Sequence, residues 1–465
     1  MVFPKLQTSY MKILWQFILL FLTISVTAQE AVDNRQREIV FRSVNIIPMD
    51  KERVIENQTV VVKNGIISAV GDASKIKYGK DALVIEAKGK YLIPGLAEMH
   101  AHVPPIDDME PMKEVVLLFA LKGVTTIRGM LGHPLHLELR NKLQRDEIIG
   151  PRFYTSGPSF NGNSVKTAEA GAALVRQQKL AGYDFLKLHP GLTKETFAAM
   201  AKTAKEVNIP FAGHVSFDVG VWRAIDAGYA TIDHLDGFVE SLVPGIENMT
   251  EQQNGLFAMF SSARADTTRI PKLMNALKEK NIWVVPTQAL AERWFAPGKD
   301  PEALRNEPEM IYMAPNTVAG WVNTKKNLMS NPGYNAESIN RFIALRRKLI
   351  YECNKNGVGL LLGSDAPQVF DVPGFSVHHE LQYMVDAGLT PYEALRTGTV
   401  NVAAFYKRPN DMGTIKSGAV SDLVLLNGNP LKEIRETRNI EGVMVGKRWL
   451  SKGYIDAELK KMVKQ

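Results

Sequence analysis

The segment Pro94-Gly95-Leu96-Ala97-Glu98-Met99-His100-Ala101-His102 has the pattern of an apolar strand that ends in two histidines. Because side chains alternate between the two faces of a strand, His100 and His102 project to the same side. Neutral imidazoles that converge in this way suit a divalent first-row metal ion. Two histidines at this spacing also occur as solvated residues, so the metal interpretation depends on further ligands downstream.

Short apolar strands alternate with helices beyond this segment. One such helix is expected from Thr193, a suitable N-cap, to Val207, before the stop signal Asn208-Ile209-Pro210. Alternation of this kind forms a parallel sheet, and the number of repeats fits eight strands. The sequence therefore predicts an α/β fold with a (β/α)8 TIM barrel over residues 93–406. The expected barrel strands are Tyr91–Ala97, Thr125–Arg128, Arg152–Ser156, Phe185–Leu188, Pro210–His214, Thr231–His234, Ile282–Pro286 and Gly359–Gly363.

Short β-branched strands occupy both ends of the chain, outside the predicted barrel. Residues 29–92 contain several of them, and Asn64-Gly65 is a strong signal for a two-residue hairpin. Residues 407–465 show a similar pattern. We expect these two segments to combine into one small β-sandwich.

A long connection separates the last two expected barrel strands. Residues 291–356 include Arg293-Trp294-Phe295 and a helical stretch from Glu337 to Glu352. An insertion of this size on a barrel is often a lid or a partner contact. An ordinary helical connection would explain it equally well.

Composition points to a folded protein without nucleic-acid affinity. Of the 465 residues, 45% are hydrophobic and 23% are charged, which is typical of globular proteins. The formal net charge of +7 is spread along the chain without a basic block, so no nucleic-acid partner is expected. Cys353 is the one cysteine, which rules out an intramolecular disulfide.

Residues 1–28 have the pattern of a signal peptide. Lys12 precedes the apolar run Ile13–Leu22, and Val26 and Ala28 occupy the −3 and −1 positions of a cleavage site. The apolar run is too short for a comfortable membrane span, which takes about 20 residues. We expect a periplasmic or secreted protein that matures near Ala28, with no membrane span afterwards. A retained signal anchor is the alternative.

Metal-ligating side chains recur at the ends of the expected strands, where barrel enzymes place their working residues. They come from strands one, four, five and six and from the residues after strand eight. A single core histidine would be unremarkable, but this set at one end of a barrel indicates a metal centre. Its members are His100, His102, Lys187, His214, His234 and Asp365.

The sequence resembles the amidohydrolase superfamily over nearly the whole chain beyond the leader. It is most similar to the branch that contains imidazolonepropionase-like and Xaa-Pro dipeptidase-type hydrolases. The stretches that carry the resemblance are Gly95–His102, Gly123–Arg128, Phe185–Leu188, Gly213-His214, Ile232–His234, Gly363–Ala366 and Gly413–Val424.

The resemblance implies a centre with two divalent metal ions. His100, His102 and Asp365 would hold the first ion. His214 and His234 would hold the second. Zinc is the expected metal, because the ligands are rich in imidazole.

Lys187 would bridge the two ions as a carbamate formed with carbon dioxide, since a protonated ammonium cannot bind a cation. An ammonium that extends to the barrel mouth, or a Schiff-base lysine, are the alternatives for this residue. The resemblance also makes Asp365 the catalytic base, which takes a proton from water and passes it to the leaving nitrogen.

One departure from the superfamily pattern argues against ring deamination. Single-metal deaminases of the superfamily lack the lysine and carry a glutamate three residues after the histidine of strand five. Here Phe217 occupies that position after His214. The same departure separates the chain from imidazolonepropionase proper, which works with one metal ion.

Several other residues are candidates for substrate contacts. His189 shares the face of Lys187, and Arg128 ends the second strand, but a mouth residue and a barrel ion pair explain them equally well. Within the insertion, Arg293 could bind a carboxylate under an aromatic lid. The lid would consist of Trp294, Phe295, Tyr312 and Trp321. Among the remaining histidines, we expect His133 and His136 to be solvated, and His378 and His379 to make ordinary packing contacts.

These observations predict an exported, binuclear, metal-dependent hydrolase of carbon–nitrogen bonds. The expected substrate is a small molecule or dipeptide, with an Xaa-Pro dipeptide as the named candidate, and the enzyme could form a homo-oligomer. The alternatives are hydrolysis of a cyclic amide or an N-acyl amino acid, a lactonase or phosphotriesterase-like activity, and a non-catalytic binding protein.

Overall fold

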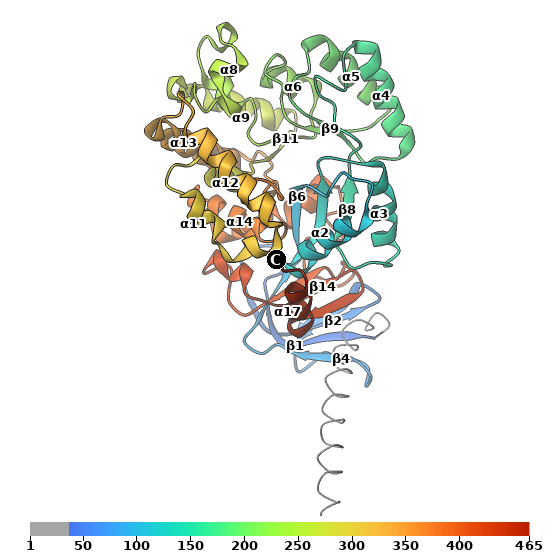
Figure 1. Cartoon of the computed structure of the whole chain (residues 1–465). Helices are drawn as coiled ribbons and strands as arrows, with labels where there is room; N and C mark the ends of the chain where they lie inside the picture. The colour runs from blue at the N-terminus through green and yellow to red at the C-terminus, as the bar shows by residue number, and fades with distance from the viewer. Residues whose placement is uncertain (1–36, 465) are drawn as a thin grey trace, which may run out of the picture.

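The computed structural model describes residues 37–464, and Figure 1 shows a barrel domain that rests on a smaller sheet domain. The predicted signal peptide, residues 1–28, lies outside the described residues. Within residues 37–464, none of the helices is both long and apolar enough to span a membrane.

The sheet domain is assembled from both ends of the chain, as predicted. Its eight strands follow the order β15-β14-β13-β5-β1-β2-β3, and β4 pairs with β1 beside this path. The antiparallel pair β5–β13 joins the N-terminal and C-terminal parts. A separate hydrophobic cluster fills this domain, in which Phe41 and Trp449 make an edge-to-face contact at 5.0 Å. The strands are β1 (Ile39–Ile46), β2 (Ile55–Lys63), β3 (Ile66–Asp72), β4 (Leu83–Glu86), β5 (Tyr91–Pro94), β13 (Leu423–Leu426), β14 (Ile440–Val445) and β15 (Arg448–Ser451).

The predicted hairpin between β2 and β3 is confirmed. Lys63 pairs with Ile66, and the two residues between them both have positive φ, 52° at Asn64 and 79° at Gly65. This is the geometry of a type I′ turn, which matches the twist of the strands it joins.

The first expected barrel strand, Tyr91–Ala97, is divided in the structure. Tyr91–Pro94 is β5 of the sheet domain, and the barrel begins with β6 at Leu96. Both parts are apolar and extended, so the sequence pattern could not reveal the change of sheet at Gly95. A Cβ at that position would lie 2.1 Å from Thr125 Oγ1, which explains the glycine at the crossing point.

Seven named strands and an eighth extended segment, residues 359–363, form the barrel, as predicted. Parallel pairing links β6 to β7 and β8, and β9 to β10, β11 and β12. A parallel bridge between Ser156 and Phe185 joins these two groups of strands. A second parallel bridge, between Val284 and Leu360, joins β12 to the eighth segment. The strands are β6 (Leu96–Ala101), β7 (Val124–Gly129), β8 (Arg152–Thr155), β9 (Leu186–Leu188), β10 (Phe211–Gly213), β11 (Thr231–Asp233) and β12 (Trp283–Val285).

Hydrogen bonds between β6 and the eighth segment close the barrel. Met99 N donates to Leu362 O at 2.8 Å, and Asp365 N donates to His100 O at 3.0 Å. These bonds place Asp365 beside the end of the strand that carries His100 and His102.

Helices surround the barrel (Figure 1). The predicted helix after β9 is α5, and its N-cap is Thr193, as expected from the sequence. The longer helices are α2 (Met109–Leu121), α3 (Pro134–Gln144), α4 (Ala168–Ala181), α5 (Lys194–Glu206), α9 (Ile270–Glu279), α12 (Pro315–Met329), α13 (Ala336–Asn356), α14 (Ser376–Asp386) and α17 (Lys452–Lys461). Shorter helices are α6 (Val221–Ala227), α7 (Phe238–Leu242), α8 (Glu251–Asn254), α10 (Gln288–Leu290), α11 (Pro301–Arg305), α15 (Pro391–Thr397) and α16 (Val400–Phe405).

The insertion at residues 291–356 is an ordered helical connection. It begins with a π-helical turn, Ala291–Phe295, and continues through α11, α12 and α13. Trp321 of α12 packs against Phe370 in a hydrophobic cluster shared with the residues after the eighth barrel segment. The insertion is thereby anchored to the barrel through apolar side chains.

Candidate metal centre

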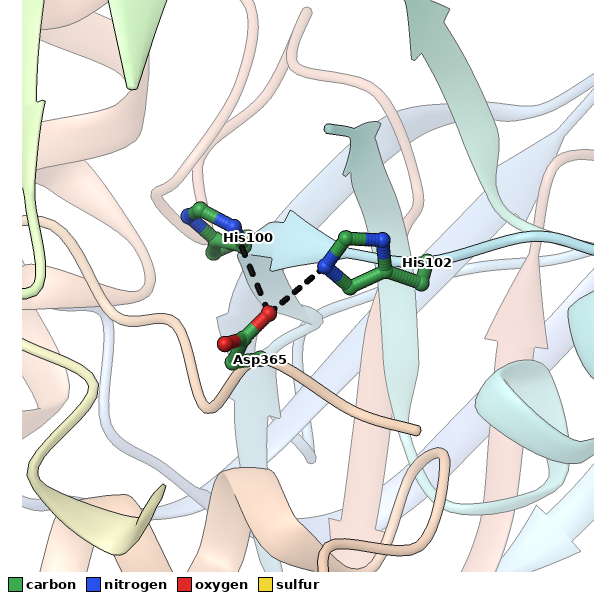
Figure 2. Close-up of side chains that lie close together, drawn as sticks. All are labelled: His100, His102 and Asp365. Atoms are coloured by element: carbon green, nitrogen blue, oxygen red, sulfur yellow. Dashed lines mark hydrogen bonds and ion pairs between the residues drawn. The ribbon is translucent and has the colours of Figure 1, made fainter. Parts of the chain in front are cut away.

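Three of the predicted ligands converge at the end of β6 (Figure 2). Asp365 Oδ1 lies 2.6 Å from His102 Nε2 and 3.3 Å from His100 Nε2. One ligand atom from each of the three residues lies within 4.8 Å of the other two, so a single ion could contact all of them. The strand alternation of His100 and His102 and the barrel closure at Asp365 together produce this arrangement.

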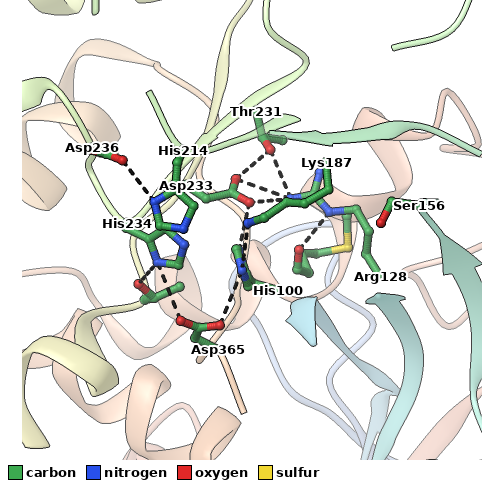
Figure 3. Close-up of polar contacts among 12 residues, drawn as sticks. His100, Arg128, Ser156, Lys187, His214, Thr231, Asp233, His234, Asp236 and Asp365 are labelled. Atoms are coloured by element: carbon green, nitrogen blue, oxygen red, sulfur yellow. Dashed lines mark hydrogen bonds and ion pairs between the residues drawn. The ribbon is translucent and has the colours of Figure 1, made fainter. Parts of the chain in front are cut away.

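The other predicted ligands lie directly beside this group, as Figure 3 shows. Lys187 Nζ lies 3.3 Å from His100 Nε2. The imidazole of His234 has its centroid 4.4 Å from that of His100 and 4.3 Å from that of His214. The barrel therefore gathers all six predicted residues, from five different strand ends, around one point.

Each of three imidazoles is oriented through its Nδ1 atom by a neighbouring oxygen. His100 Nδ1 lies 2.8 Å from Asp233 Oδ2, and His214 Nδ1 lies 3.0 Å from Asp236 Oδ2. His234 Nδ1 lies 2.9 Å from the hydroxyl of Thr287. A proton held on Nδ1 by such a partner leaves Nε2 free as an electron-pair donor, which is the usual arrangement of metal-ligating histidines.

Sequence reasoning missed these three residues, whose oxygens accept the hydrogen bonds from Nδ1. Asp233 and Asp236 flank His234 in the chain, so an acidic residue next to a strand-end histidine was the available signal. Thr287 follows β12 and carries no comparable signal.

The donor set fits a divalent cation. Among the residues that the structure describes, the buried Nε2 of His234 has no hydrogen-bond partner. Burial and the nearby Lys187 lower the pKa of His214 to about 3, and burial likewise holds the pKa values of His100 and His234 well below their usual range. All three rings are therefore neutral at pH 7, as metal ligation requires.

Lys187 is enclosed by protein. Burial lowers the pKa of its amine to about 8, although Asp233 and Asp365 partly oppose this shift. Because its pKa is lowered, such a lysine loses its proton to form the neutral amine far more readily than a surface lysine does. The side chain is fully buried, and its Nζ lies 3.3 Å from His100 Nε2, which disfavours the interpretation as a solvent-reaching ammonium.

Glu98 holds the backbone next to two of the candidate ligands, His100 and Asp365, and it was not identified from the sequence as a functional residue. It is fully buried, and burial raises the pKa of its carboxyl group to about 8. Its Oε1 accepts hydrogen bonds from the backbone N–H of His100 at 3.1 Å and of Ser364 at 2.7 Å. Glu98 thus fixes the backbone at His100 and next to Asp365, two of the three residues that would hold the first ion.

The two predicted substrate contacts have different surroundings. His189 stacks on His214 with a centroid distance of 5.1 Å and is partly exposed, beside the centre. Arg128 is 2% exposed and donates to Met99 O at 2.7 Å and to the carboxylate of Asp233 at 3.3 Å. The arginine is therefore held in a barrel ion pair, the second of the two interpretations offered for it.

The structure gives Arg293 and the expected lid aromatics partners within the protein. Arg293 is 1% exposed and is engaged by Phe370 O, Glu307 and Asp371. The four expected lid aromatics instead pack into hydrophobic clusters of the insertion and barrel; they are Trp294, Phe295, Tyr312 and Trp321. Apolar residues in an insertion can serve its own packing, and the sequence does not distinguish the two uses.

The histidines outside the centre have structural roles. His136 is fully buried, with Nε2 3.1 Å from Pro104 O, so the expectation that it is solvated is wrong. His133 caps α3 and is partly exposed. In α14, His378 contacts Thr437 and Lys122 O, and His379 contacts Glu309, as the packing interpretation predicts.

A cavity of about 950 Å³ lies next to His214, one of the two histidines that would hold the second ion. His214, Asp236 and Phe257 line it together with the residues around Trp222 and Leu256. Its walls come from the segments that follow β10 and β11, which is where barrel enzymes bind their substrates.

Comparison with known proteins agrees with this geometry. The model of the amidohydrolase family matches residues 91–453. An imidazolonepropionase from Alkaliphilus metalliredigens is 24% identical over 398 residues, which span 82% of this chain and 86% of that enzyme. An enamidase from Eubacterium barkeri is 28% identical over 142 residues, which span 30% of this chain and 36% of the enamidase.

Solved structures share the fold. A bottromycin amidohydrolase superposes with a TM-score of 0.70 at 20% identity, covering 94% of this chain and 92% of that one. A Xaa-Pro dipeptidase with bound methionine superposes with a TM-score of 0.64 at 20% identity, covering 89% of this chain and all of the other. The resemblance inferred from the sequence motifs is confirmed. Because the family model spans both the barrel and the closing strands of the sheet domain, the chain belongs to the amidohydrolase family and is a hydrolase that acts on carbon–nitrogen bonds.

Proposed function

We propose that this protein is a binuclear, metal-dependent amidohydrolase that cleaves a small amide or dipeptide. The observation that carries the proposal is the buried Lys187 Nζ, which faces the histidine cluster at 3.3 Å from His100 Nε2. A cationic ammonium is a poor neighbour for a metal ion, whereas a carbamate on the same nitrogen supplies two anionic oxygens. The carbamate forms when the neutral amine attacks carbon dioxide, which makes an N–C bond and releases one proton.

The six residues divide into two ligand groups. His100, His102 and Asp365 would hold one ion. His214 and His234 would hold the other, and the carbamate on Lys187 would bridge the two. Imidazole-rich ligation makes zinc the expected metal.

When bound, the ions would polarise the scissile carbonyl and activate water. The chain's own residues would then control orientation and proton transfer. Asp233, Asp236 and Thr287 hold the imidazoles in the tautomer that donates through Nε2. Asp365, beside the first ligand group, would accept the proton of the attacking water on a carboxylate oxygen and deliver it to the departing nitrogen.

The substrate would lie with its scissile bond at the ligand groups and its remainder in the cavity beside His214. The solved Xaa-Pro dipeptidase of the same fold makes an Xaa-Pro dipeptide the first candidate. With Arg128 and Arg293 engaged in ion pairs, a substrate carboxylate would have to be bound by His189 or by residues of the cavity rim such as Arg223 and Arg269.

The cavity volume favours a second candidate. About 950 Å³ exceeds what a dipeptide fills, and much of the lining is apolar, including Phe257, Leu256 and Trp222. An N-acyl amino acid with a bulky apolar acyl group would use this space and would be cleaved by the same chemistry.

A hydrolysis panel on zinc-replete protein tests the substrate class. We expect cleavage of Xaa-Pro dipeptides or of N-acyl amino acids, with kcat/KM for the preferred class at least about 10-fold above that for other dipeptides. The relative rates of the two classes decide between the candidates. A clear preference for an uncharged lactone or a phosphotriester would contradict the amide proposal.

We further propose that the protein is exported. The support is the pattern at residues 1–28, with Val26 and Ala28 before the expected cleavage site. When the full chain is expressed in a bacterium, the mature protein should begin near Gln29 and should be recovered outside the cytoplasm. N-terminal sequencing of each fraction checks this. A cytosolic product that still begins at Met1 or Met11 would contradict it.

A further inference from the structure

Arg346, a fully buried arginine of the insertion, contacts the backbone of a candidate metal ligand, His234. Arg346 of α13 is 1% exposed, and its guanidinium donates to three acceptors at the ends of β11 and β12. Nη1 donates to His234 O at 2.6 Å, and Nη2 donates to Pro286 O at 2.8 Å. Nε donates to the side-chain oxygen of Gln288 at 3.0 Å. One planar cation thus ties the two strand ends together.

The backbone at these strand ends adopts an unfavourable conformation. φ is +64° at His234, +55° at Leu235 and +47° at Thr287, all in the left-handed region. Residues with a Cβ rarely occupy this region, and a β-branched threonine does so least readily. This backbone brings His234 Nδ1 to within 2.9 Å of Thr287 Oγ1. Such conformations persist only where surrounding contacts impose them, and the carbonyl bonds from Arg346 are contacts of that kind.

An aromatic ring makes a second connection between Arg346 and the imidazoles. Phe257 lies 5.8 Å from the guanidinium, 5.5 Å from the His234 ring and 6.1 Å from the His214 ring. The Phe257 and His214 rings are nearly parallel, at 7°. Phe257 is therefore in contact range of both the arginine and the second ligand group.

The third acceptor of Arg346 is itself held in place. Glu380 of α14 accepts the backbone N–H of Gln288 at 3.0 Å and that of Ala289 at 2.5 Å. The Gln288 amide group also donates to Glu292 at 3.0 Å. Arg346 is thus one member of a buried network and lacks the freedom to adopt another position.

We propose that Arg346 is a positioning residue for His234, and that helix α13 of the insertion is thereby part of the metal centre. This inference rests on the proposed two-metal centre. It assigns a role to residues 291–356, because α13 holds the strand end that presents one of the two histidines of the second ion. None of the three hydrogen bonds of Arg346 goes to His100, His102 or Asp365, so we expect the first ligand group, formed by those three residues, to be affected less than His234.

Metal stoichiometry tests this inference without recourse to activity. Arg346→Met keeps the volume and removes all three hydrogen bonds, and Arg346→Lys keeps the charge but cannot span three acceptors. Arg341→Met is the matched control, because Arg341 lies on the same helix and makes an exposed ion pair with Glu337. Each protein is loaded with zinc and dialysed. Metal per chain and the zinc affinity are then measured by elemental analysis and chelator competition, with thermal unfolding recorded in parallel.

The wild type and Arg341→Met should retain two zinc ions per chain. Arg346→Met should retain about one, with the weaker site losing about 10- to 100-fold in affinity, and Arg346→Lys should fall between them. A lowered unfolding temperature with two ions bound at unchanged affinity, in either Arg346 variant, would reduce the arginine to a structural role and overturn the inference. If the wild type itself bound fewer than two ions, the two-metal proposal would fall, and this inference with it.

Discussion

Replacing Lys187 with alanine should remove most of one metal equivalent and lower hydrolysis by roughly 10²-fold or more, the cost of losing one electrostatic stabiliser of a transition state. The variant loses the nitrogen that would carry the bridging carbamate, while the five other ligands stay in place. Elemental analysis and steady-state kinetics on protein loaded with zinc and bicarbonate measure both effects. In the wild type, labelling with ¹³C-bicarbonate should give a carbamate carbon signal that is absent from Lys187→Ala.

Lys122→Ala is the matched control for that substitution. Lys122 is another largely buried lysine, and burial lowers the pKa of its amine to about 8, as it does for Lys187. Its Nζ lies over the ring of Phe375, and the residue precedes the start of β7, whereas the candidate ligands lie at the carboxyl ends of the barrel strands. We expect this variant to keep both metal ions and its activity. Full metal occupancy and normal turnover in Lys187→Ala would refute the carbamate assignment.

The features that the sequence predicted depend on short-range patterns. Alternation along β6 places His100 and His102 on one face whatever the rest of the chain does. The barrel topology then brings Lys187, His214, His234 and Asp365 to the same end, because parallel strands present their carboxyl ends together. The gathering of these six side chains at one end of the barrel could therefore be predicted from the sequence.

The features that escaped prediction depend on long-range pairing. For Arg128 the sequence left a substrate contact and a barrel ion pair open, and only the fold identifies Asp233 as its partner. For Arg293 the sequence suggested a substrate carboxylate, and the fold shows Glu307 in its place. Thr287 becomes significant only because β12 lies next to β11 in the barrel. The change of sheet at Gly95 could not be predicted either. Two consecutive apolar strands show the same sequence pattern as one longer strand, and only their pairing partners distinguish them.

Replacing Asp365 with asparagine should lower kcat by roughly 10²-fold or more, as for the loss of a general base, while most of the metal stays bound. The amide keeps the shape of the carboxylate and one oxygen that can face the ion, but it cannot take up a proton. Asparagine also suits the backbone, since φ is +73° at this position and asparagine tolerates the left-handed region. The substitution therefore separates proton transfer from folding and, in large part, from metal binding.

Asp371→Asn provides a control from the same loop. Asp371 is fully buried; burial raises the pKa of its carboxyl group and the nearby Arg293 opposes that shift, and an amide keeps the shape of the side chain. Its Oδ1 lies 3.6 Å from Arg293 Nε, and it is not one of the three residues of the first ligand group, His100, His102 and Asp365. We expect near-normal kcat and metal content in this variant. If Asp365→Asn showed normal turnover across the full pH profile with both ions bound, the base would have to be another group, and Asp365 would be left as a ligand alone.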